Sequence, residues 1–165
     1  MRLQPRIYVA CLASYNNGIY HGAWLDVDDQ LQDNIQSILK SSPIPDAEEW
    51  AIHDHEGLGN VGEYEGLDTL IPKAAFIAEH SDLGIALLEE FCGDLEDAEQ
   101  CMENYNGCFK SEVAFAEHIF EECHANAIPD NLLFYFDFEL FARDLFISDY
   151  RSVNVNGECH VFNQF

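Results

Sequence analysis

Residues 53–56 read His-Asp-His-Glu, a group of side chains whose nitrogen and oxygen atoms can bind a metal ion. Zinc sites need further ligands at workable spacing, and no HExxH or CxxC pattern elsewhere in the chain supplies them. The segment that begins at Asp94 is no calcium loop, because Glu99 stands where the EF-hand turn needs glycine. We therefore interpret residues 53–56 as the polar end of a strand and expect neither a metal site nor a cofactor.

Nucleophilic and acid–base catalysis are also poorly supported by the sequence. Adjacent carboxylates such as Glu89 and Glu90 could form the acid–base pair of a glycosidase, but among 31 Asp and Glu residues such proximity arises by chance. Cys123 and His124 are neighbours in the chain, whereas a nucleophile and its base normally come from separate parts of a fold. The GxSxG elbow and the P-loop are absent. We expect that the chain is not an enzyme.

The dominant chemical feature is uncompensated negative charge. The 31 acidic residues face 7 Lys and Arg, which gives a formal net charge of −24. Residues 41–72 and 74–109 contain many acids and no Lys or Arg. This charge excludes nucleic acid and anionic membranes as direct partners and predicts a basic partner or a pool of cations. A halophile's acidic surface, a calcium-binding module and an acidic, chaperone-like protein share the same property, so charge alone leaves these alternatives open.

The acids of residues 94–105 follow the spacing of a helix, with Asp94 as the expected N-cap. At about 100° per residue, one face is apolar and consists of Leu95, Ala98, Cys101, Met102 and Tyr105. The opposite face carries Glu96, Glu99 and Glu103, with Asp97 at its edge. Glu99 and Glu103 repel each other by a few tenths of a kcal/mol, and no basic residue in this segment relieves them.

The sequence pattern around these acids predicts helices and strands that together form an α+β fold. Strands are expected at 7–12, 19–27 and 49–54, with a helix at 28–39, so the N-terminal part (1–62) combines a sheet with a helix. The first two strands are expected to form a hairpin. Glycines after residue 56 mark a boundary near residue 62. The middle part (63–105) reads as three helices, at 67–79, 83–91 and 95–105, separated by Ser81-Asp82 and Gly93-Asp94.

The final part (106–165) follows the turn signal Asn106-Gly107 and combines helices with a small sheet. A helix is expected at 112–123, helical turns across 129–144, and a hairpin through Asn156-Gly157. The segment from Leu132 to Phe146 is very apolar, and such a run is more often core than interface. A short domain with so much aromatic surface can still dimerise through part of it. The candidate contact residues are Phe134, Phe136, Phe138, Phe141 and Phe146.

The cysteines and the chain start indicate a cytoplasmic protein. Six cysteines occur without CxxC or another paired spacing, and no export signal precedes the first strand. No apolar stretch is long enough to span a membrane. We expect reduced thiols that mostly fill the core.

Several segments together resemble one known family. Residues 6–26, RIYVACLASYNNGIYHGAWLD, look like the N-terminal signature of the ArdA antirestriction family, and residues 48–57 are similar to its strand and acidic turn. Residues 86–99 with 105–109 resemble its antirestriction motif, and residues 141–144 and 160–162 also fit. Relatives often have Arg where this chain has Ala23 and Tyr where it has His55, but the matches run in order along nearly the whole chain.

The resemblance implies three small domains, 1–62, 63–105 and 106–165, in an elongated, curved chain that forms a homodimer through its C-terminal part. It implies a DNA mimic that inhibits type I restriction-modification enzymes by binding their methyltransferase core, made of specificity and modification subunits. Restriction would be blocked more readily than modification. Such a protein would serve a mobile genetic element by protecting its DNA on entry into a host.

The charge fits mimicry of this kind. Duplex DNA carries one charge per ~1.7 Å of its axis, so 24 charges correspond to about 40 Å, or roughly 12 base pairs. Carboxylates standing in for phosphates would pair with Arg and Lys in an enzyme's DNA groove. The acids expected to form this surface are Glu89, Glu90, Asp94, Glu96, Asp97, Glu99, Glu103, Glu79, Asp82, Glu63, Glu65, Asp54, Glu56, Glu48, Glu49, Asp28, Asp29 and Asp33.

Overall fold

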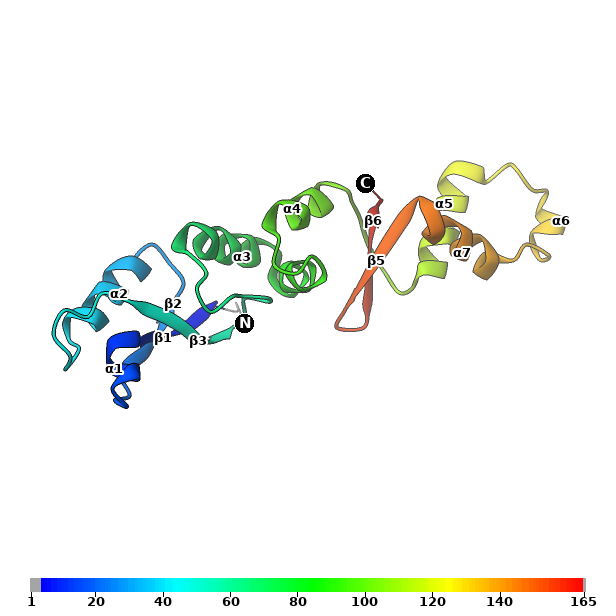
Figure 1. The fold of residues 1–165 in the computed structure, drawn as a ribbon. Coiled ribbons are helices and arrows are strands. Elements are labelled where there is room, and N and C mark those ends of the chain that lie inside the picture. The colour runs from blue at the N-terminus through cyan, green and yellow to red at the C-terminus, as the bar shows by residue number, and fades with distance from the viewer. Residues whose placement is uncertain (1–3, 165) are drawn as a thin grey trace. The chain divides into compact units, whose positions relative to one another are not determined.

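The computed structural model describes residues 4–164 and confirms a mixed α+β fold (Figure 1). The chain forms two compact units, Met1–Ala98 and Glu99–Phe165, and each contains one three-stranded antiparallel sheet. The division into three domains stays a prediction. Within residues 4–164, no helix is both long enough and apolar enough to cross a lipid bilayer.

The first unit is built on β1 (Arg6–Cys11), which lies between β2 (Gly22–Asp26) and β3 (Trp50–Glu56) and is antiparallel to both. The predicted pairing of the first two strands is confirmed. The connection between them contains a short helix that was not predicted, α1 (Leu12–Asn16). The helix α2 (Leu31–Lys40) packs on β1 and β2. Its buried face is the expected one, Leu31, Ile35 and Leu39.

The helix α3 (Leu67–Glu90) bends where the sequence predicts a break between two helices. Ser81 has φ 55° and ψ −135°, so the two arms of α3 run in different directions (Figure 1). After α3 the chain turns at Gly93, which has φ 87°. A Cβ at Gly93 would lie 2.9 Å from the Asn60 carbonyl oxygen and 3.1 Å from Lys73 Nζ, so this close approach requires glycine. The helix α4 (Leu95–Glu103) follows directly.

The second unit begins at Glu99, within α4. After α4 come β4 (Tyr105–Phe109), α5 (Glu112–His124), α6 (Asp130–Leu133) and α7 (Phe138–Ser148), and the unit ends in the hairpin of β5 (Tyr150–Val155) and β6 (Glu158–Asn163). The strand order is β4-β6-β5. Figure 1 shows α5 and α7 beside this sheet, and both contact its strands.

The core of the second unit lies between the sheet and these two helices. Phe115 of α5 is buried against Cys159 and Val161 of β6. Half-buried side chains complete this core: Phe109, Ile119, Phe146 and Tyr150. The predicted hairpin through Asn156-Gly157 is confirmed, because β5 and β6 pair on either side of these residues. Asn156 and Gly157 both have positive φ, as a tight hairpin turn requires.

The second unit contains one strand that was not predicted from the sequence. Residues 105–109 read as a turn because of Asn106-Gly107, yet they form β4 and pair with β6 about fifty residues later. The pairing register shifts between Tyr105 and Gly107, and Gly107 has φ 121°, so the glycine marks a bulge inside a strand.

The cysteines divide evenly between interior and surface. All six are free thiols, and Cys11, Cys101 and Cys159 are buried, as expected. Cys92, Cys108 and Cys123 are exposed. The expectation that most thiols fill the core is therefore wrong for these three.

Candidate functional site

The helix α4 presents a row of carboxylates on one exposed face. Ala98 and Cys101 are fully buried, whereas Glu96, Glu99 and Glu103 are exposed, as the helical spacing predicts. Asp97 is exposed at the edge of this row. The row consists of like charges three and four residues apart, which repel one another. We call Glu96, Asp97, Glu99 and Glu103 the α4 acidic row.

Asp94 holds the N-terminus of α4. Its Oδ1 accepts a hydrogen bond from the Asp97 backbone N–H at 3.2 Å, and its carbonyl oxygen accepts one from Ala98 N–H at 3.3 Å. This is the expected N-cap, and its negative charge also favours the positive end of the helix dipole. Asp94 therefore stabilises the start of α4 and also places a carboxylate beside the α4 acidic row.

Most of the other predicted carboxylates are also exposed. Those of the first unit lie before α2 and on it, before β3 and on it, in the loop after β3, and on α3. The exposed ones are Asp28, Asp29, Asp33, Glu48, Glu49, Asp54, Glu56, Glu63, Glu79, Glu89 and Glu90. Asp82 is half-buried at the bend of α3.

Glu65 differs from the rest, because it forms a buried ion pair with Lys73 of α3. The side chains of Lys73 and Glu65 are 7% and 15% exposed. Glu65 Oε2 also accepts a hydrogen bond from Gly62 N–H at 2.9 Å, and Lys73 Nζ donates to the Asn60 carbonyl at 3.4 Å. This charge is compensated and enclosed, so we leave Glu65 out of the proposed surface.

Arg6 compensates two carboxylates at one edge of the first sheet. Its guanidinium lies 3.7 Å from Asp26 and 3.9 Å from Glu56, on the two strands that flank β1. It also lies over the Trp24 ring, 5.3 Å from the centroid. These side chains are solvent-exposed, so each pair contributes little to stability. Glu56 therefore presents a weaker negative charge than the acids of the α4 acidic row.

The potential around the loop after β3 is negative enough to affect a tyrosine. The Glu63 carboxylate raises the pKa of the Tyr64 phenol by charge repulsion and by a hydrogen bond, and Glu49 adds to this effect. Glu63 and Asp54 line one open pocket of about 530 Å³ together with Tyr15, Ile52, His53, His55 and Val61. The structure thus brings together acids that are nine residues apart in the sequence.

Two patterns near this pocket have structural explanations. Within residues 4–164, His53–Glu56 contributes no atoms to a cluster of three metal-ligand groups. His53 packs edge-on against Tyr15, and the register of β3 shifts beside it.

Gly57, Gly59 and Gly62 match the GxGxxG pattern, which in a dinucleotide-binding fold lies at the start of a helix that follows a strand of a parallel sheet. Here the strands are antiparallel, and the loop lies close to α3 at Gly59, next to the fully buried Leu58.

The five phenylalanines predicted to contact a second copy occupy different environments. Phe134 is 91% exposed, and its neighbour Tyr135 is 80% exposed. Phe136, Phe138 and Phe141 are half-buried around Phe120, with ring centroids 5.0, 5.4 and 6.5 Å from it. Phe146 belongs to the core of the second unit. The apolar run is therefore partly core and partly surface.

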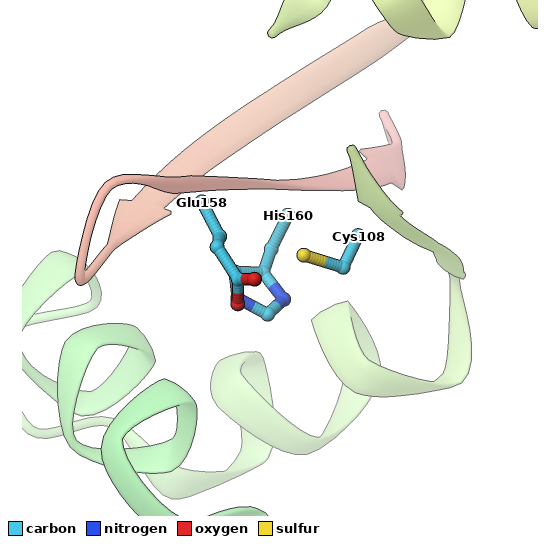
Figure 2. Close-up of side chains that lie close together, drawn as sticks. All are labelled: Cys108, Glu158 and His160. Carbon is cyan, nitrogen blue, oxygen red and sulfur yellow. The ribbon is translucent and has the colours of Figure 1, made fainter. Parts of the chain in front are cut away.

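The second sheet carries a mixed cluster of side chains that was not predicted from the sequence. The ligand atoms of Cys108, Glu158 and His160 lie within 4.8 Å of one another (Figure 2). Partial desolvation and the Glu158 carboxylate raise the pKa of the Cys108 thiol. No local sequence motif predicts this cluster, because only the pairing of β4 with β6 brings Cys108 close to the other two residues.

The comparison with known families agrees with the acidic character of the chain. The family model described as "Antirestriction protein (ArdA)" matches residues 7–159, which include all of α4, the first sheet except Arg6, and the second sheet as far as the first two residues of β6. No match was found among curated proteins. Antirestriction proteins act against restriction-modification systems, and theirs is not a known enzyme family. Since the match spans far more than half of the sequence, the chain belongs to the ArdA family of antirestriction proteins.

Proposed function

We propose that this protein is a DNA mimic that binds the DNA groove of type I restriction-modification enzymes and thereby blocks the restriction of incoming DNA. The observation that carries the proposal is the α4 acidic row, a line of exposed carboxylates with no base on the same helix. A helix that only needed solubility would gain stability from Lys or Arg at these spacings. The retained repulsion is explained when a basic partner completes the charge balance.

The spacing of the row suits a phosphate-binding groove. Residues three and four apart on a helix are separated by roughly 4.5 and 6 Å along its axis. One DNA strand places a phosphate about every 3.4 Å of axis, so the two spacings are of the same order. Arg and Lys that normally hold phosphates can therefore pair with successive carboxylates of α4. Exposed acids of the first unit, such as Glu63, Glu89 and Glu90, would extend the contact.

The class of target enzyme follows from the kind of contact that such a surface can form. Phosphate contacts carry no sequence information, so a mimic of phosphates can inhibit enzymes that differ in their recognition sequences. We propose the methyltransferase core, with its specificity and modification subunits, as the binding site. Restriction would be inhibited more readily than modification.

We further propose that the protein acts as a homodimer through the second unit. Phe134 and Tyr135 support this, since two adjacent aromatic rings exposed at 91% and 80% are costly to leave in water. A dimer would double the length of DNA imitated, from roughly 12 to about 24 base pairs. We keep the division into three domains, at 1–62, 63–105 and 106–165, as part of this proposal.

A competition experiment tests the proposal. A type I methyltransferase core is bound to labelled DNA and titrated with the protein at several salt concentrations. We expect displacement at near-stoichiometric protein at intermediate salt, and we expect it to weaken steeply as salt rises further, because the contacts are ionic. Failure to displace DNA at any salt, with the protein folded, would refute groove binding and favour an acidic chaperone-like or cation-binding role.

Two matched variants separate the α4 acidic row from total charge. One carries Glu96→Gln, Glu99→Gln and Glu103→Gln. The other carries three changes to exposed acids of α5, which are Glu117→Gln, Glu121→Gln and Glu122→Gln. Each variant removes three charges and changes the net charge from −24 to −21. We expect the α4 variant to bind roughly 3- to 100-fold more weakly and the α5 variant to change little. Equal losses would mean that total charge, and not the row, determines binding.

A further inference from the structure

The exposed face of the second sheet gathers one sulfur, one nitrogen and one carboxylate ligand. Cys108 on β4 and His160 on β6 are direct partners across the two strands. Glu158 lies two residues before His160 on β6, so its side chain projects to the same face of the sheet. Figure 2 shows the three side chains converging, with the Cys108 sulfur and the Glu158 carboxylate beside the imidazole ring.

A tyrosine orients the histidine of this cluster. The Tyr105 hydroxyl is hydrogen-bonded with His160 Nδ1 at 2.8 Å, and the two rings stack with their centroids 5.8 Å apart and planes 25° apart. Histidines that bind metals usually have their second ring nitrogen fixed by such a hydrogen bond. With Nδ1 held by Tyr105, Nε2 is the nitrogen that a metal ion would bind.

We propose that Cys108, Glu158 and His160 form a site for a zinc ion. Thiolate, imidazole and carboxylate are the three ligand types that zinc takes in proteins. One ligand atom of each residue already lies within 4.8 Å of the others, so side-chain rotations can bring the sulfur, Nε2 and a carboxylate oxygen to the separations of a tetrahedral site. Water would complete the coordination.

The chemistry of the ligands sets this site apart from the rest of the acidic surface. The many carboxylates attract any divalent cation weakly, and oxygen ligands alone suit Mg²⁺ and Ca²⁺. Sulfur and nitrogen ligands select the softer Zn²⁺ even where Mg²⁺ is abundant. Bound zinc would join β4 to β6 across a pair whose register is interrupted by the bulge at Gly107. It would therefore fix the strand that follows α4 in the chain.

Cobalt substitution tests the site directly. The full-length, reduced protein is titrated with Co²⁺ in excess Mg²⁺, and the near-ultraviolet thiolate-to-cobalt charge-transfer band is recorded. We expect a saturable band at one equivalent of metal per chain, lost when Zn²⁺ is added. A titration of the wild-type protein that shows no such band would overturn the proposal without any variant.

Variants locate the site. Cys108→Ser should abolish the band, whereas Cys123→Ser, which removes an exposed thiol of α5 in the same unit, should leave it unchanged. Tyr105→Phe keeps all three ligands and removes the hydrogen bond to Nδ1, so we expect metal binding about 10- to 100-fold weaker. Far-ultraviolet circular dichroism verifies that each variant is folded. A band that persists in Cys108→Ser, or that Cys123→Ser removes, would overturn the assignment.

Discussion

The buried ion pair between Lys73 and Glu65 offers a sharp test of how the first unit is held together. Lys73→Met retains most of the side chain's apolar length and removes the ammonium group. It leaves the Glu65 carboxylate, 15% exposed, with the Gly62 N–H as its remaining protein donor in the described hydrogen bonds. Breaking a buried pair from one side costs about 3–5 kcal/mol, because a charge stays buried without its counter-ion.

The expected loss is at the lower end of that range. Glu65 retains one hydrogen bond and some contact with water, so we expect Lys73→Met to lower the free energy of unfolding by about 3 kcal/mol. With a urea m-value of ~2 kcal/mol/M, the unfolding midpoint falls by about 1.5 M. Both tryptophans, Trp24 and Trp50, lie in β2 and β3, so their fluorescence follows the unfolding of this unit.

Two further variants complete the experiment. Glu65→Gln combined with Lys73→Met replaces the charged pair by neutral side chains of similar shape and should recover most of the lost stability. Arg143→Met removes the exposed pair with Asp144, whose side chains are 66% and 61% exposed, and should change stability by less than about 1 kcal/mol. If Lys73→Met costs no more than Arg143→Met, leaving the Glu65 carboxylate buried without its counter-ion does not destabilise the fold.

Three other predictions concern the cap of α4, the exposed aromatics and the last hairpin. Asp94→Ala should lower the free energy of unfolding by about 1 kcal/mol, as measured by urea unfolding. Asp94→Asn keeps the capping oxygen, so its free energy of unfolding should lie within a few tenths of a kcal/mol of the wild-type value. An equal cost for both would mean that the charge, and not the cap, matters. Phe134→Glu should convert dimers to monomers by light scattering without unfolding, because the ring is exposed; an unchanged mass would place the contact elsewhere. Gly157→Ala should destabilise the hairpin by about 1 kcal/mol in thermal unfolding, since φ is 85° although the space for a Cβ is open. No change in the melting temperature would show that the turn adopts another conformation.

The elements with strong local signals could be predicted from the sequence. The spacing of Leu31, Ile35 and Leu39 identified α2 and its buried face, and Asn156-Gly157 identified the β5–β6 turn. Ser81-Asp82 marked the bend of α3 because the caps of two helices meet there. The α4 acidic row was also predictable, because helical periodicity alone separates its acids from Ala98 and Cys101.

Features that depend on distant partners could not be predicted in this way. Residues 105–109 have the local composition of a turn and become a strand because β6 offers them hydrogen bonds. In the sequence Glu65 looks like the surface acids, because nothing there shows that it forms an ion pair with Lys73. The cluster of Cys108 with Glu158 and His160 is likewise a product of strand pairing.

The α4 acidic row has a consequence for the ionic strength at which the protein can work. Its exposed glutamates repel one another most at low salt, where the Debye length reaches about 30 Å, and dissolved ions relieve that repulsion. The same ions weaken the attraction to a basic groove. Salt therefore stabilises the folded helix and weakens its binding to a partner, so we expect inhibition to be greatest at an intermediate ionic strength. At lower ionic strength, repulsion among the protein's own carboxylates destabilises the fold. At higher ionic strength, screening removes the attraction between these carboxylates and the partner.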